Sequence, residues 1–292
     1  MRGLKAALIC IVAALVVAAL PPNAAFRVKL TRPWHPGDRY KFTSSVTTTN
    51  LLALNGAWPA GNGSGKCRVD LVSEVTVLDV NGRGGSTKEL HKIIKFTRTE
   101  GGASTEILKQ GDEITASLEK RERVFRRGKE PVSSEEAQVL SVVIAFDSRR
   151  AMDDEVFGTD GYRKIGDSWP VNPEAMARDV RDECQVKKED ISGTVKLAGV
   201  SKIEGTECLC IEADVKLSHI VAPMPKRSVL KSASMGMVFS GKYPVDPSLP
   251  AIESSSTVTS TATAVRREER AAPVEVYTRM VQERLERYEP IR

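Results

Sequence analysis

The sequence predicts a mainly β fold with a few helices, of the α+β class. Three observations support this prediction: long segments alternate between apolar and polar residues, Gly and Pro clusters separate them, and only two segments between them carry clear helix signals. The alternating segments are long and apolar on one side. We therefore expect a large curved antiparallel sheet, or a half-open barrel, packed on two or three helices.

The N-terminal residues have the organisation of a secretory signal peptide. Arg2 and Lys5 precede an unbroken apolar run, Ala6–Leu20, which ends in two prolines and small residues up to Ala25. A membrane anchor is the alternative, but a span needs about 20 apolar residues. We predict a signal peptide over 1–25, a single β-rich domain over 26–292, and a periplasmic or extracellular location. No second apolar run reaches spanning length, so no transmembrane segment is expected after cleavage.

The charges and the composition narrow the class of partner. The chain has 43 basic and 38 acidic side chains, a net charge of +5, and the two signs are interspersed. A nucleic-acid-binding surface would gather its basic residues on one stripe, so no nucleic acid is expected as a partner. Because aromatic residues are 5% of the chain, the core must consist mainly of Val, Ile, Leu and Ala.

Strands are predicted along the first half of the chain from residues spaced two apart. We expect three sets to share a face: Tyr40, Phe42, Ser44 and Val46; then Cys67, Val69, Leu71, Ser73, Val75 and Val77; then Leu90, Lys92, Ile94 and Phe96. Asn81-Gly82 is a tight-turn signal between the last two.

The second half repeats this pattern. Its alternating segments are Ile191–Leu197, Leu209–Leu217, Val229–Phe239 and Thr257–Val265. The tail 274–288 is ambiguous, because Tyr277, Val281, Leu285 and Tyr288 have helical spacing whereas Val274, Val276, Thr278 and Met280 alternate. Its conformation is left open.

Two helices interrupt the strands. Ser133 and Glu136 form a capping box before Ala137–Phe146, which carries an apolar stripe. Asn172 and Pro173 occupy the cap and first-turn positions of a second helix, expected to run to about Cys184.

The two halves of the chain show a weak internal sequence similarity. Gly37-Asp38 precedes Tyr40, and Gly166-Asp167 precedes Trp169. Each pair is followed further on by a strand, a Gly turn and another strand. Two related halves, about 30–130 and 160–290, are therefore an alternative to one undivided domain.

These segments carry a resemblance. The run Gly37-Asp38-Arg39-Tyr40-Lys41-Phe42, the run Lys164-Ile165-Gly166-Asp167-Ser168-Trp169-Pro170-Val171 and the hairpin at Gly205 resemble uncharacterised exported bacterial β-rich proteins. Their pattern is similar to the lipoprotein-carrier type of fold, in which a half-open β-barrel wraps a few helices. The resemblance implies a fold, and a fold alone does not license an activity.

Gly166-Asp167-Ser168 is the strongest catalytic lead, because it matches the opening block of Gly-Asp-Ser hydrolases. Those enzymes need a downstream Asp-x-x-His to supply the base. Here His219 is the only later histidine, and Lys216 stands where the aspartate should be. A turn leading into an extended segment is the favoured interpretation, so no catalytic residue is predicted.

A candidate phosphate-binding loop is the Gly-rich stretch that contains Gly61, Gly63 and Gly65. Such a loop needs a helix N-terminus directly after the glycines, whereas a strand pattern follows here. A hairpin loop is expected, with Asn62-Gly63-Ser64 as a glycosylation acceptor if the source glycosylates. No cofactor is predicted.

The mature chain has four cysteines, Cys67, Cys184, Cys208 and Cys210. In an exported protein they favour disulfides. Cys208 and Cys210 share one strand face and lie too far apart to bridge each other, so Cys184 is the preferred partner for one of them. Free structural thiols are an alternative. A metal site on Cys208 and Cys210 would need ligands from His35, His91 or His219, which are isolated in sequence, and no metal ligand is predicted.

The leading functional hypothesis is an exported, non-enzymatic protein that binds a lipid or another apolar molecule. It rests on apolar rows that a curled sheet would turn inward. The candidate ligand-facing residues are Leu209, Ile211, Val215, Met235, Met237 and Phe239. A completely filled, solid core is the competing expectation for these rows. The alternative functions are a hydrolase that uses Ser168 and a structural interaction module that pairs through a sheet edge.

Overall fold

The protein is mainly β, as the sequence predicts. The computed structural model describes residues 24–54, 64–120, 122–146, 151–182, 184–222, 224, 227–266 and 273–291. Within these ranges it contains fifteen strands and three α-helices. Thirteen of the strands form one antiparallel sheet that does not close into a barrel. The predicted signal peptide lies almost entirely outside the described residues, as do Gly61, Asn62 and Gly63.

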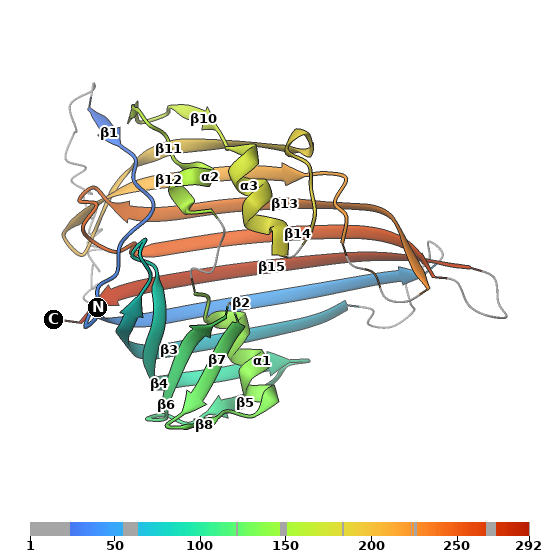
Figure 1. Cartoon of the computed structure of the whole chain (residues 1–292), viewed down its shortest axis with the longest axis horizontal. Coiled ribbons are helices and arrows are strands. Elements are labelled where there is room, and N and C mark those ends of the chain that lie inside the picture. Colours follow the sequence, from blue (N-terminus) through green and yellow to red (C-terminus); the bar gives the residue numbers. More distant parts are fainter. Residues whose placement is uncertain are drawn as a thin grey trace, which may run out of the picture.

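The large sheet consists of two meanders joined side by side (Figure 1). One contains β2 (Arg39–Leu54), β3 (Ser64–Val80), β4 (Ser86–Glu100), β6 (Glu113–Glu119), β7 (Glu122–Arg127) and β8 (Glu130–Pro131), with β5 (Ala103–Leu108) paired to β4. The other contains β10 (Ser168–Pro170), β11 (Ile191–Ile203), β12 (Thr206–Leu217), β13 (Ser228–Pro244), β14 (Glu253–Arg266) and β15 (Val274–Pro290). Separately, β1 (Ala25–Arg27) pairs with β9 (Tyr162–Lys164).

The ambiguous tail is the strand that joins the two meanders. β15 pairs with β14 on one side and with β2 on the other, where the pairing runs unbroken from Val276 opposite Leu54 to Pro290 opposite Tyr40. Both edges of β15 are therefore hydrogen-bonded within the sheet. The helical spacing of its larger side chains is overridden by this pairing.

One face of the sheet, which we call the inner face, carries two separate hydrophobic clusters. The N-terminal cluster packs β2, β3, β4, β6 and β7 against α1 (Ser134–Val143), whose Val139, Leu140 and Val143 are buried. The predicted capping box is present: the Glu136 amide donates to Ser133 Oγ at 3.2 Å, and the Ser133 amide donates to Glu136 Oε2 at 2.8 Å. Strands β5 to β8 were not predicted, because all four are short and β7 is dense in charged residues.

Two arginines from the sheet bind the C-terminal end of α1. Arg123 of β7 donates to the carbonyls of Ser141 at 2.6 Å and Ile144 at 3.1 Å. Arg284 of β15 donates to the Val142 carbonyl at 2.7 Å. The last turn of α1 has no basic residue of its own, so these side chains satisfy its otherwise unpaired carbonyls. The Arg284 contact also ties α1 to the other meander.

The C-terminal cluster packs β11, β12 and β13 against α2 (Asp153–Phe157), α3 (Pro173–Asp179) and the segment that carries Val28 and Leu30. Asn172 caps α3 as predicted, because its Oδ1 accepts from the amides of Glu174 and Ala175, each at 3.1 Å. The helix is shorter than expected. It ends at Asp179, a 3-10 turn follows over Val180–Asp182, and Cys184 lies beyond both.

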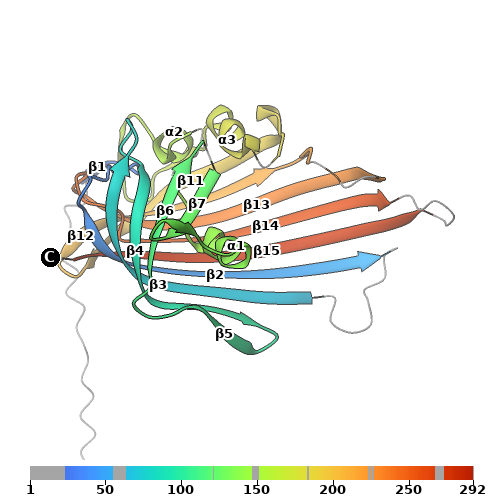
Figure 2. The same ribbon diagram turned by 60° about the horizontal axis from the view of Figure 1, so that its bottom comes forward.

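Both clusters lie on the same face of the sheet. The strand register shows this, because Ile211 of the C-terminal cluster is opposite Gly241, and the row continues through Ser254, Glu286 and Ser44 to Leu71 of the N-terminal cluster. Residues directly opposite one another in antiparallel strands share a face. Figure 2 shows the two sets of covering elements on the same side of the bent sheet.

The prediction that Leu90, Lys92, Ile94 and Phe96 of β4 share a face is wrong, because Phe96 lies on the opposite side from the other three. Glu89, His91 and Ile93 point into the N-terminal cluster with Phe96, whereas Lys92 and Ile94 are exposed and Leu90 lies on their side. The register shifts where Val72 is opposite Lys95 and Ser73 is opposite Ile93, so Ile94 is an extra residue in β4. Such a bulge reverses the alternation on either side of it, and period-two counting cannot detect it.

The predicted face of Val229 is wrong because of a second bulge, in β13. The bulge lies between Leu230 and Ser232, so that Leu230 pairs with Ala264 on the inner face and Val229 pairs with Val265 on the outer face. Ala233, Met235, Met237 and Phe239 remain on the inner face, as predicted.

The two Gly-Asp pairs form turns with the same hydrogen bonds. The Gly37 amide donates to the Val77 carbonyl at 2.8 Å and the Val77 amide to the Asp38 carbonyl at 2.9 Å; Gly166, Leu197 and Asp167 make the corresponding bonds at 2.7 and 3.0 Å. Both glycines have positive φ, +96° and +93°, a conformation that L-residues adopt only with strain.

The turn at Asn81 also forms, in a slightly different place from that expected. The Gly84 amide donates to the Asn81 carbonyl at 2.9 Å, and the residue with positive φ is Gly84 rather than Gly82. A Cβ on Gly84 would lie 2.9 Å from Pro33, so close approach is a second reason for glycine there.

Candidate binding face

The six predicted ligand-facing residues all lie on the inner face, but they divide into two groups. Leu209, Ile211 and Val215 are at most 1% exposed and belong to the centre of the C-terminal cluster. They are core residues, and the expectation that they face a ligand is corrected. Met235, Met237 and Phe239 are half-buried at the margin of the same cluster. Phe239 stacks on Phe157 of α2, with ring centroids 5.9 Å apart and planes at 9°.

The inner face between the two clusters is covered by neither. Apart from Tyr288, no described residue of β14 or β15 belongs to either cluster. In Figure 1 the covering helices lie over the two flanks of the sheet, α3 over β11 to β13 and α1 over the lower strands. We call this uncovered region, with the margin at Met235 and Met237, the open inner face. Its apolar members on the central strands are Leu52, Leu54, Leu230, Val258, Ala262, Ala264, Val276 and Met280.

The open inner face is polarised along the strands. At one end the cross-strand rows are largely apolar: Leu230, Ala264, Val276 and Leu54 form one row. At the other end Arg284 and Glu286 of β15 form an ion pair at 2.7 Å, and the Tyr288 hydroxyl donates to Glu286 at 3.2 Å. The rows between the two ends mix apolar and polar side chains: Met235, Ser260, Met280 and Asn50 form one, and Met237, Val258, Gln282 and Thr48 form another.

Three large apolar side chains of this surface are unusually exposed. Leu52 is 38% exposed, Leu54 is 43% and Met280 is 37%. None of the three was singled out from the sequence, because the tail was left unassigned and β2 was followed only as far as Val46. Continuing the count through Thr48 and Asn50 would have placed Leu52 and Leu54 on the same face.

A buried polar chain in the N-terminal cluster was also missed, for a physical reason. His91 Nδ1 lies 3.0 Å from Ser73 Oγ, His91 Nε2 lies 3.1 Å from Glu89 Oε2, and the Tyr40 hydroxyl donates to Glu89 Oε1 at 3.1 Å. The bulge in β4 turns Glu89 and His91 inward. Without it the two side chains would face solvent, as the sequence pattern suggested.

These hydrogen-bonded side chains follow the order of a Ser-His-acid triad, but a substrate cannot reach them. Ser73 is 0% and His91 1% exposed, so no substrate carbonyl can reach the hydroxyl in this conformation. Burial, with the nearby Glu89 carboxylate adding to it, raises the pKa of Tyr40 well above its usual value. This row of polar side chains is therefore a hydrogen-bonded part of the core, in which each member satisfies its neighbour.

Ser168 is exposed, and its motif is a turn. Asp167 Oδ2 accepts from the Lys164 amide at 2.8 Å, and Trp169 is buried, its Nε1 donating to the Phe157 carbonyl at 2.8 Å. His219 contacts Asp190 at 2.6 Å, far from Ser168 in the fold. Among the described residues, Ser168 has no histidine within hydrogen-bond distance.

The cysteines occupy opposite faces of the sheet. Cys208 and Cys210 alternate with the core residues of β12 and point to the outer face, whereas Cys184 is buried in the C-terminal cluster on the inner face. The predicted bridge from Cys184 to either would have to cross the sheet. Cys67, Cys208 and Cys210 are free thiols, and burial, followed by the neighbouring Cys210, raises the pKa of Cys208. The described part of the chain holds no cluster of three or more potential metal ligands.

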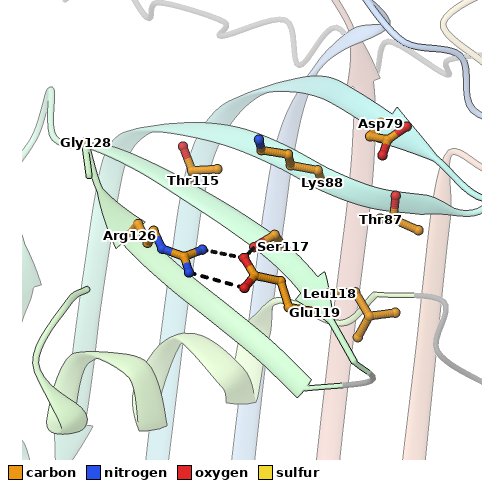
Figure 3. Close-up of a pocket in the computed structure, with 9 residues that line it drawn as sticks. All are labelled: Asp79, Thr87, Lys88, Thr115, Ser117, Leu118, Glu119, Arg126 and Gly128. Atoms are coloured by element: carbon orange, nitrogen blue, oxygen red, sulfur yellow. Dashed lines mark hydrogen bonds and ion pairs between the residues drawn. The ribbon is translucent and has the colours of Figure 1, made fainter. Parts of the chain in front are cut away.

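A polar hollow of about 320 Å³ lies elsewhere, on the face of β6 opposite the buried Ile114 and Ala116 (Figure 3). Two of its charged groups satisfy one another: Arg126 holds Glu119 through both terminal nitrogens, and Ser117 donates to Glu119 at 2.9 Å. These hydrogen bonds, that from Arg126 foremost, lower the pKa of Glu119 to about 2. Arg126 and Glu119 are thus already paired, and we assign no ligand to this hollow.

Comparisons with known proteins identify no family. No family model matches the chain, and no curated protein matches it. Among solved structures, a loop L8 deletion mutant of OmpT, an outer membrane protein of Vibrio cholerae, is 10% identical with a TM-score of 0.20, over 86% of this chain and 99% of that one. P47 from Clostridium botulinum A2 is 9% identical with a TM-score of 0.17, over 83% and 80%. Scores of this size establish neither a shared fold nor a shared function. No helix within the described ranges is long and apolar enough to cross a membrane.

Proposed function

We propose that this is an exported, non-enzymatic protein that binds an elongated apolar or amphiphilic molecule, such as the acyl chain of a lipid, along its open inner face. The observation that carries the proposal is the apolar surface on β13, β14, β15 and β2 that neither helix-covered cluster buries. Contiguous exposed apolar surface on a protein that stays in solution indicates a binding site. Export is part of the proposal and rests on the signal-peptide pattern of residues 1–25.

The dimensions of the surface suit an acyl chain. From Thr48 to Leu54 the uncovered inner face of β2 rises about 20 Å, which exceeds the roughly 15 Å that one leaflet contributes to the hydrocarbon core of a bilayer. The two methionines at its margin, Met235 and Met237, have flexible thioether side chains that adapt to guests of varied shape. The lipoprotein-carrier resemblance of the sequence agrees with this class of ligand and remains part of the proposal.

The test is a titration of the delipidated protein with a fluorescent fatty acid. We expect saturable binding that Met237→Gln weakens at least about threefold, since burying a polar amide against an acyl chain costs of the order of 1 kcal/mol. Val238→Gln is the matched control. Val238 is adjacent on β13 but points to the outer face, where it is 58% exposed, so its substitution should leave the affinity unchanged.

A second matched pair examines the other side of the surface. Met280→Gln on the inner face of β15 should weaken binding, whereas Val281→Gln on its outer face should not. Absence of saturable binding, or equal losses within both pairs, would contradict the proposal. If saturable binding is found, mass spectrometry of molecules that co-purify with the native protein would identify the natural ligand.

A further inference from the structure

One end of the central strands extends past the end of β12 and past the helices that cover the two clusters (Figure 1). β12 ends at Leu217, opposite Met235. The Ala233 carbonyl still accepts from the Ile220 amide at 3.2 Å, and beyond it Ser228–Ser232 of β13 pair only with β14. Figures 1 and 2 show β13, β14, β15 and β2 continuing past α1 and α3 in this direction. We define the projecting end as residues 50–54, 227–234, 260–266 and 274–280.

The projecting end exposes a large apolar side chain on each of its two faces. Leu54, 43% exposed, lies on the inner face, and Val229, 46% exposed, lies on the outer face because of the bulge after Leu230. A ligand on the inner face alone does not account for Val229. Exposed apolar side chains on the two sides of one sheet end are suited to a surrounding that is apolar on both sides, as the interior of a bilayer is.

The charges of the projecting end are mostly positive. Its described residues include four cations, Arg227, Lys231, Arg266 and Arg279, and one anion, Glu275. Lys231 and Arg279 are exposed, and neither makes an ion pair within the described part of the chain. Elsewhere on the molecule many exposed cations are paired, as Arg126 is with Glu119 and Lys188 with Glu174.

We propose that the projecting end docks on an anionic lipid surface, with Leu54 and Val229 entering the interface and Lys231 and Arg279 contacting lipid headgroups. Apolar side chains flanked by Lys and Arg bind such surfaces through burial and electrostatic attraction together. The open inner face continues from Leu54 to Met237, so docking would place it next to the source of an acyl ligand. The supply of an acyl ligand to the open inner face rests on the proposed function, whereas the docking does not.

The test is flotation of the mature protein with vesicles, at low salt, of phosphatidylcholine alone and of phosphatidylcholine mixed with phosphatidylglycerol. We expect binding to the mixed vesicles only, and its loss in about 1 M salt, where the Debye length falls to about 3 Å. Lys231→Glu combined with Arg279→Glu should weaken binding at least about tenfold. Leu54→Gln combined with Val229→Gln should also weaken it.

The control variants lie away from the projecting end. Lys202→Glu changes an exposed cation at the opposite end of β11, and Leu78→Gln changes a 40% exposed leucine at the opposite end of β3; both should bind as the unchanged protein does. Equal binding to the two kinds of vesicle, no binding to either, or equal losses in the control variants would overturn the proposal. The salt and lipid comparisons use the unchanged protein, so they test the docking proposal even if a variant fails to fold. Failure here with intact fatty-acid binding would leave the proposed function standing.

Discussion

Two buried serines on neighbouring strands show how much a single hydrogen bond matters in this core. Ser73 of β3 and Ser44 of β2 are both 0% exposed on the inner face. Ser73 Oγ is bonded to His91, whereas Ser44 Oγ has no hydrogen-bond partner among the described residues. The pair therefore separates the value of a satisfied hydroxyl from that of an unsatisfied one.

Replacing each serine with alanine should have opposite consequences. Ser73→Ala leaves the buried imidazole without one partner and should lower the free energy of unfolding by about 1–3 kcal/mol. Ser44→Ala removes an unsatisfied polar atom and should leave the stability equal or slightly higher. Urea denaturation of the two variants measures the difference, and equal destabilisation would contradict the assigned hydrogen bonding.

Tyr40, which is buried, and Tyr288, which is half-buried, predict a loss of stability at alkaline pH. Burial, with Glu89 and Glu286 respectively as the main nearby charges, raises the pKa of Tyr40 and of Tyr288 well above 10.0. Above pH 10 the unfolded chain releases these protons and the folded chain keeps them, so the free energy of unfolding falls as pH rises. Each group contributes about 1.4 kcal/mol per pH unit in that range.

Tyr40→Phe should therefore flatten the alkaline decline measured by urea denaturation between about pH 10 and the folded-state pKa. Tyr162→Phe is the control, since Tyr162 is 71% exposed and should leave the slope unchanged. The slope is the quantity to compare, because Tyr40→Phe also removes the hydrogen bond to Glu89. Identical slopes in the two variants would show that Tyr40 is not held protonated by the fold.

At the scale of the element, the two Gly-Asp turns are expected to be equivalent in energy. Each glycine has positive φ, and a Cβ would meet nothing within 4 Å, so only backbone strain opposes substitution. Gly37→Ala and Gly166→Ala should each lower the free energy of unfolding by about 1–2 kcal/mol. Gly82→Ala, in open space and without positive φ, should have no such cost. A large difference between the first two would contradict the equivalence of the turns, which is also what the proposal of two related halves requires.

The elements that sequence patterns predicted well are those with an unbroken alternation and one buried face. β2 and β3 are examples: Tyr40 to Val46 and Val69 to Val77 point inward as counted. Ser133 and Asn172 marked the starts of α1 and α3 because capping is a local interaction. The Gly-Asp-Ser motif was correctly taken as a turn.

The elements that failed depend on pairing between distant strands. The bulges at Ile94 and Lys231 are set by the register of neighbouring strands, so no local count shows them. The tail needed β2, from the opposite end of the chain, to define it as a strand. The candidate binding face was half found for the same reason: Met235, Met237 and Phe239 followed from alternation in β13, whereas Leu52, Leu54 and Met280 join them only through β15.

At the scale of the whole molecule, the question is whether the two clusters unfold together. They share no residue, yet β15 joins them by pairing with β2 along its length, and Arg284 of β15 donates to the Val142 carbonyl of α1. Loss of either cluster alone would leave the other with a long unpaired strand edge, a costly and aggregation-prone state. This favours coupled unfolding, although chains of this size often populate intermediates.

Each cluster contains one tryptophan that can report on it. Trp34 stacks on Tyr40 of the N-terminal cluster at 4.6 Å, and Trp169 is buried in the C-terminal cluster. In a background with Trp58→Phe, the variants Trp34→Phe and Trp169→Phe each leave a single fluorophore. We expect their urea transitions to have the same midpoint once each is compared with circular dichroism of the same variant, because the β15–β2 pairing makes the sheet one cooperative unit. If fluorescence and circular dichroism gave different midpoints in the two variants, the meanders would be independent folding units, and the covering elements on the two sides of the open inner face could move relative to each other.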